Sequence, residues 1–319
     1  MKKQAIILCI LGTFFFISNF NVLGQKPIKN LYNGLNFRNI GPAMTSGRIA
    51  DIAIHPENEN IWYVAVGSGG VWKTLNSGTT WKPIFDNQKV YSTGCVTIDQ
   101  NKPSTIWLGT GENVGGRHAG FGDGIYVSHN DGKSWKNMGL KNSEHLSKII
   151  VHPENSNIIW AASQGPLWSK GGDRGVYKTT DGGKKWNRTL GDSEWVGATD
   201  MLIDPTNPDI LYAATWQRHR TVAGYLGGGP GSGLHKSIDG GETWRALKNG
   251  IPKSNLGKTG LAMSPFNSNV IYAALEFDRT KGGVYMTTNG GESWTKQSDA
   301  VSGGTGPHYY QELIASPHQ

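Results

Sequence analysis

The sequence is poor in cysteine and in charge. Its 319 residues include only two cysteines, and 17% are Asp, Glu, Lys or Arg, against roughly a quarter in average soluble proteins. Cys9 lies within the N-terminal residues 1–24. If these residues are removed, Cys95 is the only cysteine, and no intramolecular disulfide can form. The formal net charge is +7, but no basic run contains aromatic residues. We therefore expect no nucleic acid partner.

Amphipathic helical patterns and long apolar runs are missing beyond the N-terminus. Residues 1–24 contain Lys2 and Lys3, an apolar core from Ala5 to Ile17, and Gly24 at a cleavage point, which predicts a secretory signal peptide. A membrane anchor is the alternative, but this apolar run is short for a membrane span. We expect a secreted, periplasmic or cell-surface protein with no membrane span after signal removal.

Glycine, by contrast, is abundant, with 45 residues, and much of it belongs to a repeated octapeptide. Each copy has Ser or Thr first, Asn or Asp third, Gly fifth and Trp eighth. The third side chain is expected to accept bonds from the amides ahead, and the Gly to take a positive φ. Each copy therefore predicts a hairpin turn with a core Trp. The copies are TLNSGTTW, SHNDGKSW, TTDGGKKW, SIDGGETW and TTNGGESW, ending at Trp81, Trp135, Trp186, Trp244 and Trp294.

A second repeat supplies the rest of the unit. An apolar strand and a turn, usually with Pro and Asn, occur at IADIAIHPEN, CVTIDQN, SKIIVHPEN, DMLIDPTN, GLAMSPFN and ELIASPH, and another apolar strand follows the first five. His55 and His152 occupy the same repeat position as Asp99, Asp204 and Ser264. We interpret them as turn caps rather than as metal ligands.

Together the repeats predict an all-β fold, a β-propeller with four-stranded blades, because the octapeptide Trp residues recur every 50 to 58 positions. We expect five complete blades and the start of a sixth at Glu312 to His318. The blades would occupy residues 49–319, with 25–48 as an N-terminal segment that contains a candidate ring-closing strand. We interpret the chain as a C-terminally truncated part of a larger propeller. A closed ring of five or six blades is the alternative.

Insertions are predicted on one face only. The connection from second to third strand has 5, 14, 13, 19 and 9 residues in successive units, and in a four-stranded meander it lies opposite the octapeptide turns. Loops on a rigid scaffold commonly carry binding residues. The candidate ligand-binding residues are Arg48, Arg117, His118, Trp168, Arg174, Trp195, Trp216, Arg218, Arg220, Tyr225 and Arg279.

The composition of these loops suits a sugar. Trp168, Trp195 and Trp216 fall in loops beside Arg and carboxylate residues, and aromatic rings stack on sugar rings. The alternative is that the Trp residues fold back over their own loops. Glycoside cleavage needs two carboxyl groups roughly 5 to 10 Å apart. The alternative for each loop carboxylate is that it is solvated or paired with an Arg. The candidate catalytic carboxylates are Glu112, Asp123, Asp173 and Glu276.

Motifs for other chemistries are not evident. We find no metal-ligand cluster, no phosphate-binding glycine loop and no Ser-His-Asp order. We therefore expect no metal and no cofactor.

The octapeptides resemble Asp-box (BNR) repeats, and they cover nearly all of the chain after the leader. They are similar to those in the propellers of sialidases, xyloglucan-cleaving enzymes, the photosystem II assembly factor and sortilin. The stretches GPAMTSGRIADIAIHPEN and GGVWKTLNSGTTWKPIFD look most like secreted bacterial members described as sortilin-like or glycosyl-hydrolase-like. The resemblance implies the propeller fold, which hosts unrelated functions.

Two enzyme classes within this resemblance have key residues that are altered here. The xyloglucan-cleaving enzymes carry a catalytic Asp in a first-blade motif, whose matching stretch YVAVGSGGVWKT has Gly67 instead. The sialidase Phe/Tyr-Arg-Ile-Pro motif is approached only by FRNIGP, where Asn39 follows Arg38. Our hypothesis is therefore a secreted binding or scaffold propeller that recognises a glycan or peptide. The alternative is a glycoside hydrolase, sialidase-like or xyloglucanase-like, with a loop carboxylate pair.

Overall fold

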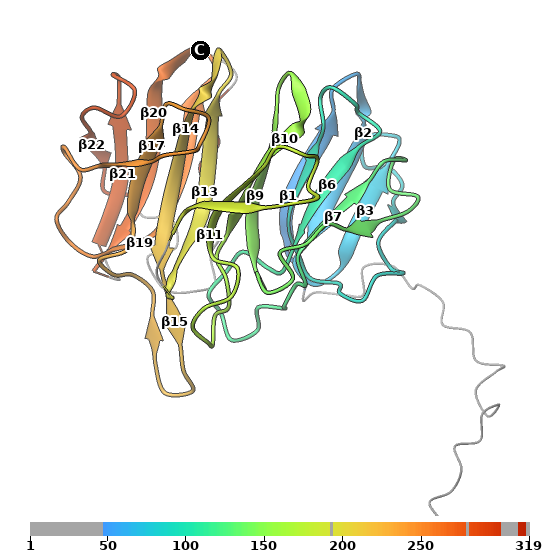
Figure 1. Ribbon diagram of the computed structural model, residues 1–319, viewed down its shortest axis with the longest axis horizontal. Helices are drawn as coiled ribbons and strands as arrows, with labels where there is room; N and C mark the ends of the chain where they lie inside the picture. The colour runs from blue at the N-terminus through green and yellow to red at the C-terminus, as the bar shows by residue number, and fades with distance from the viewer. Residues whose placement is uncertain (1–46, 192–193, 279–280, 301–311, 317–319) are drawn as a thin grey trace, which may run out of the picture. The chain divides into compact units, whose positions relative to one another are not determined.

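The computed structural model describes residues 47–191, 194–278, 281–300 and 312–316 (Figure 1). The predicted leader 1–24, nearly all of segment 25–48, and Arg279 lie outside the described residues. Within the described ranges the chain forms strands, turns and bends but no helix, so none of these segments is a helical candidate for crossing a membrane.

Five antiparallel sheets of four strands follow one another along the chain, which confirms the predicted all-β fold and its four-stranded units. The sheets are β1 (Ile49–His55), β2 (Asn58–Val66), β3 (Gly70–Thr74) and β4 (Lys82–Pro83); β5 (Thr93–Ile98), β6 (Ile106–Thr110), β7 (Ile125–Ser128) and β8 (Lys136–Asn137); β9 (Leu146–His152), β10 (Asn155–Ser163), β11 (Gly175–Thr179) and β12 (Asn187–Leu190); β13 (Val196–Asp204), β14 (Asn207–Gln217), β17 (Gly233–Ser237) and β18 (Arg245–Leu247); and β19 (Leu256–Ser264), β20 (Asn267–Phe277), β21 (Lys281–Thr287) and β22 (Thr295–Ser298).

One hairpin was not foreseen. Within the connection from β14 to β17, β15 (His219–Arg220) pairs with β16 (Tyr225–Leu226). Figure 1 shows this hairpin projecting beyond the ends of the sheets.

The first strands of successive sheets lie next to one another, as they do around the axis of a propeller. Contacts join β1 to β5, β5 to β9, β9 to β13 and β13 to β19. Two carboxylates strengthen these contacts, because Asp51 Oδ2 accepts from the Val96 amide at 3.0 Å and Asp200 Oδ2 accepts from the Leu261 amide at 2.8 Å.

The octapeptides form the predicted corners. In the fourth copy, Asp239 Oδ1 accepts from the amides of Glu242 at 3.1 Å and Thr243 at 3.0 Å, and Gly241 has a φ of 81°. The corner also contacts the beginning of the second strand, β14, where the Gly240 amide donates to the Asp209 carbonyl at 2.9 Å. The corners therefore lie at the end of the sheets opposite the second-to-third loops.

The corner tryptophans pack against the preceding sheet. Trp135 Nε1 donates to the Ile84 carbonyl at 2.8 Å, and Trp186 Nε1 donates to the Met138 carbonyl at 2.9 Å. The prediction that every corner Trp is core is wrong for Trp81, which is 40% exposed. The described residues contain no sheet before the first one, so Trp81 lacks the surface that buries its equivalents.

The two histidines cap turns, as predicted. His55 Nδ1 accepts from the Glu57 amide at 3.2 Å, and His152 Nδ1 accepts from the Glu154 amide at 3.0 Å. Asp204 Oδ1 accepts from the Thr206 amide in the same way, at 2.8 Å.

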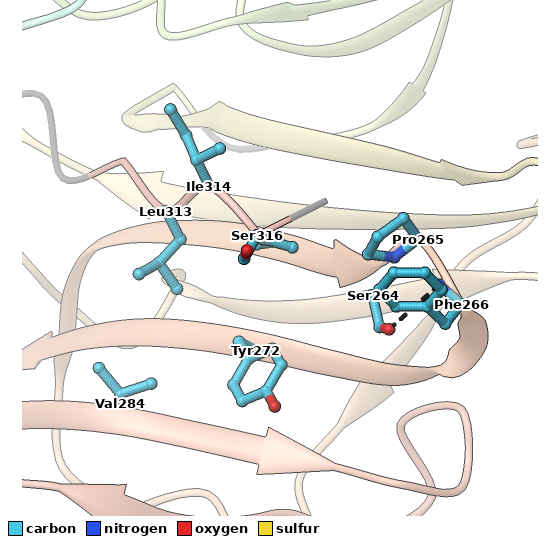
Figure 2. A pocket seen from close by; sticks show the side chains of 10 residues that line it. Ser264, Pro265, Phe266, Tyr272, Val284, Leu313, Ile314 and Ser316 are labelled. Carbon is cyan, nitrogen blue, oxygen red and sulfur yellow. Dashed lines mark hydrogen bonds between the residues drawn. The ribbon is translucent and has the colours of Figure 1, made fainter. Parts of the chain in front are cut away.

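Residues 312–316 lie beside the fifth sheet without forming a strand. Figure 2 shows Leu313 facing Tyr272 and Val284 across a cavity of about 380 Å³. The observed sheets agree with five complete blades, and this short segment begins to cover the last one.

Candidate functional site

The long loops converge at the end of the sheets opposite the octapeptide corners. Loop 111–124, between β6 and β7, receives bonds from two later sheets. Arg218 Nη1 donates to the Val114 carbonyl at 2.8 Å, and Lys258 Nζ donates to the Asn113 carbonyl at 2.6 Å. The loops of the second and fourth sheets and strand β19 of the fifth sheet are therefore connected at this end of the sheets, which we call the long-loop face.

Three arginines predicted to bind ligand instead hold these loops together. Arg174, Arg218 and Arg220 are buried. Arg174 Nη1 donates to the Gln164 carbonyl at 3.0 Å, and Arg220 Nε donates to the Gly115 carbonyl at 3.0 Å. Burial lowers the pKa of Arg218 to about 9 and that of Arg174 to about 10. These buried guanidinium groups therefore bond the loops to one another beneath the surface of the long-loop face.

The three tryptophans predicted to lie in loops have different environments. Trp216 lies in strand β14 rather than in a loop; it is 3% exposed, and its Nε1 donates to the Gly227 carbonyl at 2.9 Å, so it contacts the connection that follows its strand. Trp195 is half-buried and lies 4.0 Å from the His219 ring, centroid to centroid. Trp168 is 37% exposed. Trp168 is thus the most exposed of these three tryptophans.

The remaining predicted side chains contribute to loop contacts or to the surface. Arg117 and His118 are exposed, and Arg117 Nη2 donates to the Val222 carbonyl at 3.0 Å. Tyr225 lies beneath Arg220, with the guanidinium 4.3 Å from the ring centroid.

The four candidate carboxylates do not form one group. Glu112 is fully buried and forms an ion pair with Arg48, whose Nη2 donates to Oε2 at 2.7 Å. Glu276 belongs to β20 of the fifth sheet and packs against Gly257. Three of the four lie near one turn, Asn142–His145, between β8 and β9: the Glu112 carbonyl and the Asp173 carboxylate contact it, and Asp123 follows Gly122, which bonds it.

Bonds from two loops meet at this turn. Asp173 Oδ2 accepts from the Asn142 amide at 2.9 Å, and the Gly122 amide donates to the Glu144 carbonyl at 2.8 Å. Asp123, which follows Gly122, accepts from the Tyr126 hydroxyl at 2.9 Å. The turn and both loops therefore form one rigid corner of the long-loop face.

Glu144 is a residue that the sequence analysis missed. Its side chain is 32% exposed, and its backbone has a φ of 54°, a conformation that costs energy for a residue with a side chain. Burial raises the pKa of its carboxyl group, against the opposing effects of the Leu167 backbone, Arg218 and Arg174. A carboxyl group of this kind favours its protonated form more than an ordinary glutamate does.

The next residue, His145, faces this carboxyl group. His145 Nε2 lies 4.0 Å from Glu144 Oε2 and has no hydrogen-bond partner among the described residues. Its Nδ1 lies 2.8 Å from the Glu112 carbonyl, so Nδ1 carries the proton when the ring is neutral. Burial and the charge of Arg218 hold the pKa of His145 well below its usual value. The neutral ring therefore leaves an unprotonated Nε2 4.0 Å from the Glu144 carboxyl group.

Two exposed aromatic residues lie close to residues that neighbour Glu144. Phe121 is 55% exposed, and its ring lies 5.9 Å from the His145 ring. The Leu167 backbone interacts with the Glu144 carboxyl group, and the exposed Trp168 follows Leu167. A half-buried acid whose neighbours in the fold or the sequence include two exposed aromatic residues matches the needs of a sugar site. The sequence could have pointed to Glu144, because it lies in the connection from the fourth strand of one unit to the first strand of the next. That connection lies on the same face as the second-to-third loops.

Comparisons with known proteins agree with this architecture. The Sortilin-Vps10 family model, described as sortilin, neurotensin receptor 3, matches residues 123–227. An oligoxyloglucan-reducing end-specific xyloglucanase from Emericella nidulans is 21% identical and covers 72% of this chain and 27% of its own length.

Solved structures of similar proteins lead to the same fold. An ancestral GH74 enzyme has a TM-score of 0.61 at 20% identity, over 79% of this chain and 32% of that one. The GH74 xyloglucanase from Xanthomonas campestris has a TM-score of 0.59 at 16% identity, over 78% and 38%. The chain spans between 20% and 27% of the length of the xyloglucanases that match its sequence.

Proposed function

We propose that this Asp-box β-propeller is a glycoside-hydrolase-like protein whose long-loop face binds a glucan of the xyloglucan class. The observation that supports this most strongly is sequence similarity to four proteins named as xyloglucanases, over 54% to 83% of the chain. Secretion, which residues 1–24 predict, would place the protein among polysaccharides.

The proposed sugar contact is the corner formed by Glu144, Phe121 and Trp168. The exposed rings would stack on sugar faces, and the carboxyl group would bond the sugar edge. The buried arginines and the Arg48–Glu112 pair would keep the corner rigid, which reduces the entropy lost when a ligand binds.

If the protein cleaves its ligand, Glu144 is the best placed proton donor. Its pKa is raised by burial, and a general acid must hold its proton at the working pH. Asp173 is the proposed partner carboxylate, because it bonds the amide of Asn142, two residues before Glu144. The acid would protonate the glycosidic oxygen, and Asp173 would activate water or attack the sugar carbon.

A second function is favoured by Gly67, which stands where the similar xyloglucan-cleaving enzymes carry a catalytic Asp. On this basis the same face binds glycan without cleaving it. A peptide ligand is a further form of this binding hypothesis.

The two functions separate in one set of assays. Purified protein is incubated with xyloglucan, and both retention on an immobilised polysaccharide and release of reducing ends are measured. Hydrolysis predicts release that falls about 100-fold or more in Glu144→Gln and in Asp173→Asn. Binding alone predicts retention without release, weakened by Trp168→Ala.

Glu154→Gln is the matched control, because Glu154 is an exposed carboxylate at the opposite end of the sheets, where the octapeptide corners lie. It should leave retention and release unchanged. Absence of both retention and release with xyloglucan would rule out the proposal, and retention of a peptide in its place would support the peptide form.

A further inference from the structure

A second cavity lies between the connection from β14 to β17 and the segment that joins β18 to β19. It has a volume of about 660 Å³, within the range of small-ligand sites. Its walls are the glycine-rich segment 229–233 and the segment 246–256 that leads into β19. The isolated bridge between Gly229 and Leu256 ties these two walls together.

The lining combines an apolar floor with a positive rim. Leu234, Leu247 and Leu256 are buried, whereas Lys248 and Lys253 are exposed. The residues that line the cavity include no Asp or Glu. The lining therefore includes two lysines and no carboxylate.

These two lysines differ from the lysines of the sheets. Lys178 forms an ion pair with Glu242 at 2.7 Å, and Lys236 lies 3.9 Å from Glu292. Neither Lys248 nor Lys253 forms a salt bridge with a residue that the structure describes. Their charge is therefore not neutralised by the described part of the fold.

His235, on β17, adds a polar group to the wall. Its Nδ1 is buried and has no hydrogen-bond partner within the described ranges. Burial lowers the pKa of His235 to about 4, so the ring is neutral at pH 7 and can both donate and accept. The charge of Lys248 adds to this lowering of the His235 pKa.

We propose that this cavity binds a sugar unit that carries a carboxylate, such as a uronic acid. Lys248 and Lys253 contact the carboxylate, His235 bonds a ring hydroxyl, and the leucine floor lies under the apolar face of the sugar ring. An acidic sugar uses all three features at once, whereas a neutral sugar leaves the lysines unused. The inference is independent of hydrolysis at Glu144.

The test compares an acidic and a neutral ligand of equal length. Calorimetry with trigalacturonic acid is expected to show binding that weakens as salt is raised, and cellotriose is expected to bind at least about tenfold more weakly. The double variant Lys248→Met and Lys253→Met keeps the apolar stems and should lose about tenfold or more in affinity for the acid. Lys184→Met with Lys185→Met, two exposed lysines of an octapeptide corner, is the control with the same change in charge.

A second readout follows His235 by NMR. Bound carboxylate should raise its pKa from about 4, because an anion favours the protonated ring. Equal affinity for cellotriose, unchanged affinity in the Lys248/Lys253 variant, or equally tight binding of inorganic phosphate would each overturn the assignment. Xyloglucan retention is scored separately with Trp168→Ala, so failure of one proposal is not failure of the other.

Discussion

Arg218 Nη1 donates a 2.8 Å hydrogen bond to the carbonyl of Val114, although 104 residues separate them in sequence. Its Nη2 also donates to the Gly165 carbonyl at 3.0 Å. One buried guanidinium group therefore joins loops from the second, third and fourth sheets. Because hydrogen bonds to charged donors are stronger than neutral ones, this residue determines how the loops of the proposed sugar site are placed.

Replacing Arg218 with Met should destabilise the protein by about 2 to 4 kcal/mol, because two buried carbonyls lose their donor. Denaturant unfolding measures the change. Arg188→Met, at an exposed position on β12, should stay within about 0.5 kcal/mol. An Arg218→Met variant as stable as the Arg188→Met control would show that the loops do not depend on this contact.

The carboxylates of the octapeptide corners should make the free energy of unfolding depend on pH. Hydrogen bonds from Thr243 hold the pKa of Asp239 well below its usual 3.8, and the Lys185 amide acts in the same direction on Asp181. The stabilisation is therefore complete above the unfolded pKa and is lost as pH falls below about 4.

Asn serves the same geometry in other copies, where Asn130 Oδ1 accepts from the Ser134 amide at 2.9 Å. A double Asp181→Asn, Asp239→Asn variant should match the parent at pH 7 and lose less stability between pH 4 and 2. Thermal unfolding across that range is the measurement, and parallel curves would contradict the assignment.

Glu144 should oppose stability while it serves function. Since the folded protein raises its pKa above the usual 4.5, folding favours the protonated form, and stability falls as pH rises from 4.5 through the folded pKa. Glu144→Gln should remove this loss and stabilise the protein at pH 7 by up to about 1 kcal/mol. The same variant should lose glycan release. A destabilised Glu144→Gln protein would instead assign the residue a structural role.

Gly111 tests the geometry of the same corner. It has a φ of 85°, and a Cβ there would lie 1.6 Å from the Glu144 carbonyl oxygen, so that something must move. Gly111→Ala should cost about 2 to 4 kcal/mol and weaken xyloglucan retention. Gly171 is the control, because its φ of 78° is similar but nothing lies within 4 Å of its Cβ position. Gly171→Ala should cost only about 1 to 2 kcal/mol.

Local chemistry made the repeat architecture predictable. An octapeptide corner depends on bonds within its own eight residues, such as those from Glu242 and Thr243 to Asp239, and on a Gly that adopts positive φ. The turn caps His55 and His152 act over two residues. Because a meander reverses direction at each turn, the ends at which corners and long loops lie also followed from the pattern.

Contacts between distant residues decided the rest. The pattern placed Arg174, Arg218 and Trp216 in surface loops, but all three are buried, and Trp216 belongs to strand β14. Trp81 has the same local sequence context as Trp294, yet Trp81 is 40% exposed and Trp294 is 3% exposed, because burial depends on a neighbouring sheet. Glu144 belongs to no repeat, and its raised pKa arises only where three loops exclude water from it. Turn geometry is set by a few adjacent residues, whereas exposure and proton affinity are set by whatever the whole chain packs around a group.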